Sequence, residues 1–361
     1  MSNGYRLRIT VKRALVIVLL LIQIFLFTLA FTRYLQVLQW LTIVLQFISF
    51  FVALAIINRT TKSGFKLSWV FLILAFPLVG GILYLLFSFQ GSAKKMDRCL
   101  RTIESHTKGV MFFDKTFTET LDSPDINQMR YLMNHLHYPA CTNTETKFLC
   151  PGEAFLPVLL EELRKAEKYI FMEYFIFQPG AMLDSILDIL EAKAREGVEV
   201  RIIFDDFGCF VTVPSDFQRQ LERRGIKAIK FNPFRPILTA VQNNRDHRKI
   251  ASIDGKVAFT GGINLSDEYI NAVDVHGRWE DSAIMVSGDA AWCLTVIFLQ
   301  MWNLNTVIAR NKGRILVKES QVTSSLEDFS AYKPVLEALP EAQGIVIPYA
   351  DSPMDDENIG E

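Results

Sequence analysis

The chain has 361 residues, half of which are hydrophobic, and a formal net charge of −1. This balance excludes a strongly basic protein that would bind nucleic acid through its overall charge. The five cysteines form no C-x-x-C pair and their number is odd, so the sequence predicts neither a zinc site, nor a redox dithiol, nor a disulfide framework. The length suits a membrane region followed by one large or two small domains.

Three apolar runs open the chain. They cover residues 14–31, 36–57 and 67–89, and none of them contains Asp, Glu, Lys or Arg. Each run is long enough to cross roughly 30 Å of hydrocarbon as a helix. No small-x-small cleavage site closes the first run, which favours an uncleaved anchor over a signal peptide. We therefore predict that residues 1–90 form a membrane region with two to three transmembrane helices.

Basic residues near these runs leave the orientation of the membrane region open. They precede the first run, separate the second run from the third, and follow the third: Arg6, Arg8, Lys12, Arg13; Arg59, Lys62, Lys66; Lys94, Lys95, Arg98 and Arg101. If all three runs span, positive-inside counting cannot place all three groups in the cytoplasm. The Phe76-Pro77 and Gly80-Gly81 pairs weaken or kink the third run unless neighbouring helices pack there.

Beyond the membrane region, residues 91–125 are polar and charged and are predicted to be a linker. Helical and strand patterns then alternate along the chain. We expect helices at 155–168, 182–196, 215–224 and 288–304, and strands at 169–177, 198–206, 226–231, 247–253, 256–260, 281–286 and 344–349. This order predicts an α/β fold in which helices flank a mixed sheet.

The stretch "NNRDHRKIASIDGKVAFTGGINLSDEY", residues 243–269, concentrates the residues with chemical potential. Asp254-Gly255 lies between two alternating apolar runs, which predicts a β-hairpin. On an extended strand, positions i and i+2 face the same way. His247 and Lys249 are therefore expected to project together, and Arg248 is expected to point to the other face.

These residue types suit attack on a phosphodiester. A neutral imidazole can attack phosphorus, and an ammonium group beside it offsets the negative charge of the phosphate. Backbone amides near Gly261 and Gly262, with the Asn264 side chain, could bind the non-bridging oxygens. This set needs no metal, although Asp205 and Asp206 keep that question open. Taken singly, each residue has an ordinary structural explanation, such as a turn at Asp254 or a bend at Gly261-Gly262.

The full spacing H-x-K-x4-D-x6-G-G-x-N resembles the phospholipase D superfamily and is carried by His247, Lys249, Asp254, Gly261, Gly262 and Asn264. Its surroundings look like the first catalytic motif of bacterial cardiolipin synthases. "KLSWVFLILAFPLVGGILYLLF" (66–87) is similar to the membrane region of that family, and "GRWEDSAIMVSG" (277–288) also fits. The resemblance implies one half of a phospholipase D-like α/β/α sandwich behind the membrane helices.

The resemblance also implies a reaction. The family joins two phosphatidylglycerols into cardiolipin, releases glycerol and uses no cofactor. For this sequence, the resemblance implies that His247 is the nucleophile and that Lys249 binds phosphate. It also implies that Asn264 assists and that Asp254 supports the site. Glu173 either orients a histidine or lies on the exposed face of an edge strand. The expected location is the bacterial inner membrane, with several spans and a cytoplasmic catalytic domain.

One part of the family pattern is missing. His247 is the only histidine of this sequence that begins the full H-x-K-x4-D spacing, and His276 is followed by Gly277 and Arg278. We therefore expect residues 126–312 to form the first catalytic domain, and 313–361 to form a connector and the start of an incomplete second half. Truncation, a homodimer that completes the site, or an inactive chain would each explain this. Another phosphodiesterase of the superfamily, such as a nuclease or lipid hydrolase, is the alternative function.

Overall fold

The computed structural model describes residues 17–28, 36–58, 63–88, 91–111, 126–233, 245–275, 277–310 and 318–351. The chain divides into two compact units, which we call the membrane unit (1–94, 235–244 and 353–361) and the sheet unit (95–234 and 245–352). Several residues of the sequence predictions lie outside the described ranges: Arg6, Arg8, Lys12, Arg13, Arg59, Lys62, His276, and residues 112–125, 313–317 and 352–361.

The membrane unit contains a helix over 17–28, α2 (Gln36–Ile57), α3 (Ser63–Ala75) and α4 (Pro77–Ser88). In α2, residues 40–57 are long and apolar enough to cross a membrane. The third apolar run is interrupted at the predicted Phe76-Pro77 position, because α3 ends at Ala75 and α4 begins at Pro77. The number of transmembrane helices, two to three, stays a prediction. Proline lacks the N–H of a helix interior and disfavours helical backbone at the residue before it, whereas it suits the first position of a new helix.

The sheet unit is built on a seven-stranded mixed sheet with the order β1-β7-β6-β5-β2-β3-β4. The strands are β1 (Thr144–Leu149), β2 (Tyr169–Tyr174), β3 (Glu199–Asp205), β4 (Lys227–Phe231), β5 (Ile250–Ile253), β6 (Val257–Gly261) and β7 (Ala283–Gly288). Strands β2, β3 and β4 are parallel to one another, and the remaining neighbours pair antiparallel. The predicted hairpin is confirmed, since β5 and β6 pair across the turn at Asp254 and Gly255.

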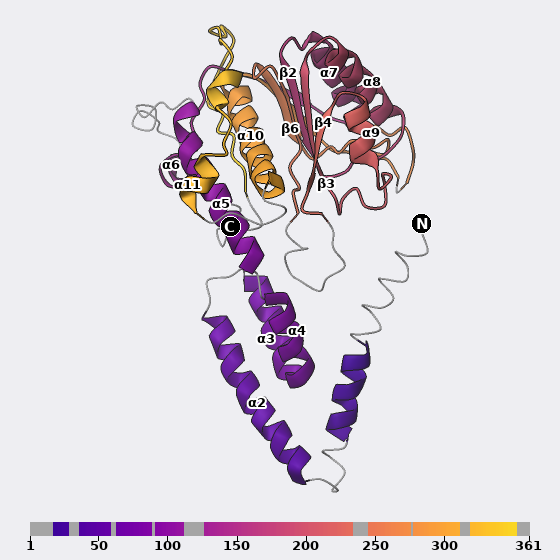
Figure 1. Ribbon diagram of the computed structural model, residues 1–361, viewed down its shortest axis with the longest axis vertical. Coiled ribbons are helices and arrows are strands. Elements are labelled where there is room, and N and C mark those ends of the chain that lie inside the picture. The colour runs from indigo at the N-terminus through magenta and orange to yellow at the C-terminus, as the bar shows by residue number, and fades with distance from the viewer. Residues whose placement is uncertain are drawn as a thin grey trace. The chain divides into compact units, whose positions relative to one another are not determined.

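Helices cover both faces of this sheet (Figure 1). On one face lie α7 (Gly152–Lys165), α8 (Ala181–Arg195) and α9 (Phe217–Arg223), and on the other lies α10 (Asp289–Arg310). Helix α10 is apolar enough to pass as a membrane span, but 89% of it is buried, which makes it a core helix of the sheet unit. The predicted α/β fold with a mixed sheet flanked by helices is confirmed.

The predicted linker differs from the structure over its first part. Residues 91–107 form α5 (Gly91–Thr107), whose Cys99, Leu100 and Ile103 are buried. The Gln300 side chain of α10 donates a hydrogen bond of 2.8 Å to Thr107 Oγ1, so the end of α5 is tied to the core helix. The apolar residues of α5 recur at helical spacing between charged ones. The overall composition of the segment is polar, so composition alone predicted a linker where an amphipathic helix forms.

The predicted connector also packs onto the sheet unit. It contains α11 (Glu319–Thr323) and a 3-10 turn (Phe329–Tyr332), and Phe329 is buried. The Tyr169 hydroxyl donates to the Tyr332 carbonyl oxygen at 2.7 Å, which fastens this segment to β2. The strand expected at 344–349 is reduced to an isolated bridge between Val346 and Cys141. Two further short helical segments are α6 (Ile126–Arg130) and a π-helical turn (Tyr131–His135), and a 3-10 turn (Lys108–Val110) follows α5.

Candidate functional site

One edge of the sheet collects the residues of the H-x-K motif. Strands β2 and β3 end there, β5 begins there because it runs antiparallel to β2, and β6 ends there beside the start of β7. The carboxyl ends of parallel strands are the usual place for ligands in open α/β sheets. Five of the residues predicted from the motif (His247, Lys249, Gly261, Gly262 and Asn264) belong to segments that meet at this edge, which we call the motif edge.

His247 and Lys249 lie in the extended segment that leads into β5, and both contact the ring of Phe175. The His247 ring centroid is 4.8 Å from that of Phe175, and Lys249 Nζ lies 5.7 Å from the same ring. Lys249 Nζ also donates a hydrogen bond of 2.7 Å to the His247 carbonyl oxygen. Phe175 directly follows β2 in the chain. The side chains of both motif residues pack against its ring.

The charges of this pair are set by burial and by two aspartates. His247 is exposed, whereas Lys249 is buried. Desolvation and the charge of Lys249 lower the pKa of His247, and Asp246 opposes them. Burial lowers the pKa of Lys249 to about 8, against the charges of Asp246 and Asp281. At neutral pH the arrangement therefore holds a neutral imidazole beside an ammonium group, which is the combination that attack on a phosphodiester needs.

Asp205 holds the backbone just before His247 in place. Its buried carboxylate accepts hydrogen bonds from the N–H groups of Phe207 and Gly208 and, at 3.0 Å, from the N–H of Asp246. Burial raises the pKa of Asp205 to about 6 against these hydrogen bonds and the charge of Arg245. Asp206 pairs instead with Lys230 at 3.1 Å. The described residues include no group of three His, Cys, Asp or Glu that could hold a metal ion, and Asp205 is explained as a positioning residue.

The two glycines let the end of β6 approach β7 closely. A Cβ on Gly261 would lie 2.4 Å from the Ser282 carbonyl oxygen, and one on Gly262 would lie 2.1 Å from Asp281 Oδ1. Asn264 is buried, and its amide links two segments: Oδ1 accepts from the Ile176 N–H at 3.2 Å and Nδ2 donates to the Tyr269 hydroxyl at 2.8 Å. These contacts give all three residues a structural role at the motif edge, and phosphate binding by them stays a prediction.

Asp254 lies at the opposite end of β5 from His247. Its carboxylate accepts three hydrogen bonds of 2.8 Å from the backbone N–H groups of Glu167, Lys168 and Tyr169, which lead into β2. Its backbone has φ 52°, a conformation that Asp and Asn tolerate better than most residues. Asp254 therefore holds β2 and the β5–β6 turn together, and its part in catalysis stays a prediction.

We expect Asp254→Ala to lower the free energy of unfolding by about 3 kcal/mol, because three backbone N–H groups, that of Tyr169 buried, would lose a charged acceptor. Asp254→Asn keeps one acceptor oxygen and the tolerance for positive φ, so it should lose clearly less. Urea unfolding of the detergent-solubilised protein, followed by tryptophan fluorescence, measures both variants. Equal stabilities for wild type and Asp254→Ala would contradict this role.

Glu173 occupies neither of its two predicted positions. It lies on β2 between β5 and β3, so it is not on an edge strand, and its side chain is fully buried. It pairs in register with Ile250, on the face of Arg248, whose Nη1 is 4.0 Å from Glu173 Oε1. His247 faces the other side, so Glu173 is not placed to orient it. Neither carboxyl oxygen has a hydrogen-bond partner among the described residues.

Burial, reinforced by the charge of Asp246, raises the pKa of Glu173 well above its usual value, and Arg248 opposes this. The folded protein thus keeps a proton that the unfolded chain releases, so stability falls as pH rises above the usual glutamate range. We expect Glu173→Gln to gain thermal stability relative to wild type as pH increases. Melting temperatures over a pH series measure this, and Glu167→Gln, at an exposed carboxylate, is the control. A pH-independent difference would contradict a protonated Glu173.

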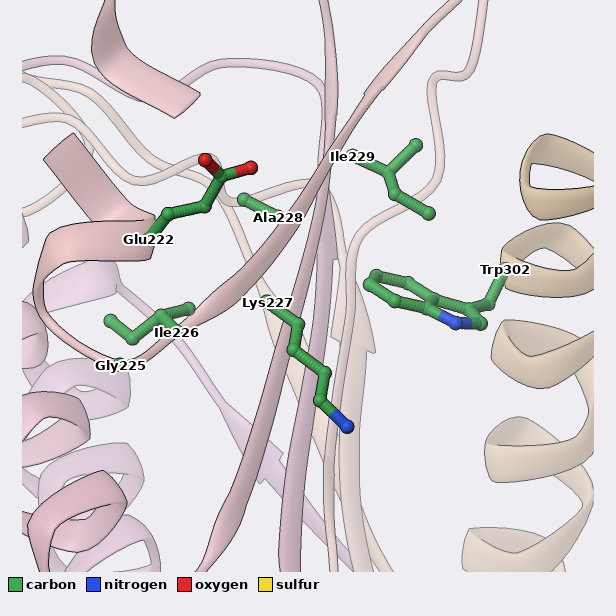
Figure 2. A pocket seen from close by; sticks show the side chains of 7 residues that line it. All are labelled: Glu222, Gly225, Ile226, Lys227, Ala228, Ile229 and Trp302. Carbon is green, nitrogen blue, oxygen red and sulfur yellow. The ribbon is translucent and has the colours of Figure 1, made fainter. Parts of the chain in front are cut away.

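Two residues at the motif edge escaped the sequence prediction. Phe175 carries no signal beyond its place in an apolar strand, and Asp281 carries none beyond its place in "GRWED", which resembles the family. A cavity of about 360 Å³ in the sheet unit lies elsewhere. It surrounds the start of the edge strand β4, where Lys227, Ile229 and Trp302 line it from one side (Figure 2). It contains none of the motif residues.

Comparisons with known proteins agree with the motif. Residues 159–302 match the family model "Cardiolipin synthase, PLD-like domain", and residues 47–88 match "Phospholipase D-nuclease N-terminal". An uncharacterized protein of Streptococcus mutans is 35% identical over 312 residues, which cover 85% of this chain and 64% of that protein. A cardiolipin synthase of Alkalihalophilus pseudofirmus is 30% identical over 293 residues, which cover 76% and 54%. A probable cardiolipin synthase of Bacillus subtilis is 32% identical over 251 residues, which cover 68% and 49%.

The helix-flanked mixed sheet and the motif at its edge define a domain of the phospholipase D superfamily. Within that superfamily, the chain belongs to the cardiolipin synthase family. It spans between 49% and 64% of the length of these three relatives. Among solved structures, the phospholipase D family member Nuc from Salmonella typhimurium aligns with a TM-score of 0.34 and 19% identity, over 48% of this chain and 99% of that one. The relatives and the N-terminal apolar helices indicate a membrane protein.

Proposed function

We propose that this protein is a membrane-bound phosphatidyltransferase that forms cardiolipin from two phosphatidylglycerols and releases glycerol. The observation that carries the proposal is the exposed imidazole of His247, which shares the Phe175 ring with the buried Lys249 at the motif edge. The lowered pKa of His247 favours the neutral imidazole that such an attack needs. The family match and the apolar N-terminal helices support a lipid substrate. The proposed location is the bacterial inner membrane, with more than one span and the sheet unit in the cytoplasm.

In the first half of the proposed reaction, a His247 ring nitrogen attacks the phosphorus of one phosphatidylglycerol. The bond from phosphorus to the headgroup glycerol oxygen breaks, and that oxygen takes up a proton and leaves as glycerol. The phosphatidyl group then remains on His247. Lys249 offsets the negative charge that the phosphoryl oxygens carry through the transition state.

In the second half, a headgroup hydroxyl of another phosphatidylglycerol gives up its proton, and its oxygen displaces His247 from phosphorus. Cardiolipin forms and the imidazole is regenerated. A group that donates and then accepts this proton is required. No other histidine of the printed sequence begins the full H-x-K-x4-D spacing, so we propose that a second copy of the chain, or a second motif outside these residues, supplies it.

The test is to incubate the full chain, purified in detergent, with phosphatidylglycerol and to measure cardiolipin and glycerol. The proposal expects the two products in equal amounts, and EDTA is expected to leave the rate unchanged. Phosphatidic acid in place of cardiolipin would assign a lipid hydrolase instead, and cleavage of nucleic acid with no lipid product would assign a nuclease. If cross-linking of an active sample shows only monomers, a second copy of the chain cannot be the source of the second proton carrier.

A further inference from the structure

The third apolar run folds back on itself. Helix α3 has 13 residues and α4 has 12, which correspond to about 20 Å and 18 Å at 1.5 Å per residue. Either helix alone is therefore too short for roughly 30 Å of hydrocarbon. Between them, Phe76 N–H donates to the Leu72 carbonyl oxygen at 2.9 Å and Gly80 N–H to that of Phe76 at 2.7 Å. Backbone groups at the break are thus hydrogen-bonded within the protein, which is necessary inside the hydrocarbon because no water is available there.

Two contacts show that α3 and α4 run antiparallel rather than as one kinked helix. A Cβ on Gly80 would lie 2.5 Å from the Leu72 carbonyl oxygen, and the rings of Trp69 and Tyr84 are 5.6 Å apart. In a continuous helix, residues eight apart are separated by about 12 Å along the axis. Both pairs are nearly symmetric about Phe76, so the break at Phe76-Pro77 is the tip of a helical hairpin, which Figure 1 shows as α3 beside α4.

The open end of this hairpin lies level with the carboxyl end of α2. Lys66 Nζ lies 3.5 Å from the carbonyl oxygen of Ile57, the last residue of α2. A cation is favourable there, because the carboxyl end of a helix carries a partial negative charge. The tip reaches the first helix, since Ala75 and Phe76 line a cavity of about 500 Å³ together with residues of the 17–28 helix: Gln23, Ile24, Phe27 and Thr28. The outer surface is apolar and exposed at Leu67, Phe71, Leu74 and Leu85, as expected for contact with lipid tails.

We propose that the α3–α4 hairpin is a re-entrant element, which enters the bilayer from one side and returns to that side. The first apolar run and α2 are then the two spans. The chain segments before the first span, between α2 and the hairpin, and after the hairpin all lie on one side. Eleven basic residues fall in these segments, whereas the segment between the spans, residues 29–35, has only Arg33. Positive-inside counting, which conflicted with three spans, now assigns all eleven to the cytoplasm.

Single-cysteine labelling of the full chain in intact cells and in inverted membrane vesicles tests this topology. The background variant is Cys150→Ser, because Cys150 is exposed whereas Cys99, Cys141, Cys209 and Cys293 are buried. A membrane-impermeant maleimide is applied to Ser2→Cys, Thr32→Cys, Thr61→Cys and Ser92→Cys. We expect Ser2→Cys, Thr61→Cys and Ser92→Cys to label in inverted vesicles only, and Thr32→Cys to label in intact cells only.

Labelling of Ser92→Cys from the same side as Thr32→Cys would overturn the proposal, because it requires three spans. Leu74→Cys, near the tip, distinguishes insertion from a hairpin that lies flat on the surface. An inserted tip should resist the reagent from both sides, and labelling of Leu74→Cys in inverted vesicles would overturn the proposal. The assay reads membrane position and not lipid transfer, so its outcome is separate from that of the cardiolipin assay.

Discussion

His247→Ala should abolish cardiolipin formation, with a loss on the order of 10^4- to 10^6-fold, because it removes the imidazole that is proposed to take the phosphatidyl group. The residue is exposed, and its side chain makes no hydrogen bond to another described residue, so its removal should leave the fold unchanged. Rates with phosphatidylglycerol and the melting temperature measure these two effects separately.

Covalent capture makes the assignment specific. With phosphatidylglycerol labelled in its phosphate, the wild-type chain should retain acid-labile label after rapid denaturation, and His247→Ala should retain none. The matched control is His135→Ala, since the His135 ring stacks on Tyr131 in the π-helical turn, outside the motif edge. Retained label on His247→Ala, or an unchanged rate, would remove His247 from the role of nucleophile.

Local patterns predicted most helices and strands of the sheet unit, because period and turn chemistry are properties of neighbouring residues, but they missed β1 (Thr144–Leu149) and predicted a strand at 344–349 that is only an isolated bridge. The hairpin at Asp254-Gly255 placed His247 and Lys249 on one face, and both residues contact Phe175 in the structure. What the pattern could not give is strand order. The contact with Phe175 exists because β2 lies beside β5, and their pairing joins segments far apart along the chain.

The same limit explains the corrections. Asp254 accepts hydrogen bonds from residues that precede it by 85 to 87 positions, so a local argument saw only its turn. The sequence predicts that Glu173 lies on an edge strand or orients a histidine. The strand order instead places it on a central strand, on the same face as Arg248. In the membrane unit, hydropathy gave the length of the third run, and the contacts of Gly80 with Leu72 and of Trp69 with Tyr84 show the reversal at Pro77.

Lys249 carries the second large effect. Replacement by glutamine removes the cation beside the attacked phosphate, and we expect a loss of about 10^2- to 10^3-fold in kcat, the range found when one electrostatic stabiliser is deleted. The Lys249 ammonium also donates to the His247 carbonyl oxygen, so the melting temperature of Lys249→Gln must accompany its rate. Arginine keeps the charge with a different shape and should retain part of the activity.

The pH profile separates the charge of Lys249 from its packing. Activity should rise as pH increases through the pKa of His247, which is lowered below its usual range, because the neutral imidazole is the nucleophile. It should fall as pH increases through about 8, where Lys249 loses its proton. Arginine stays protonated, so Lys249→Arg should keep the acidic limb and lose the alkaline one. An alkaline limb that is unchanged in Lys249→Arg would show that another group causes it, and that the charge of Lys249 does not limit the transfer.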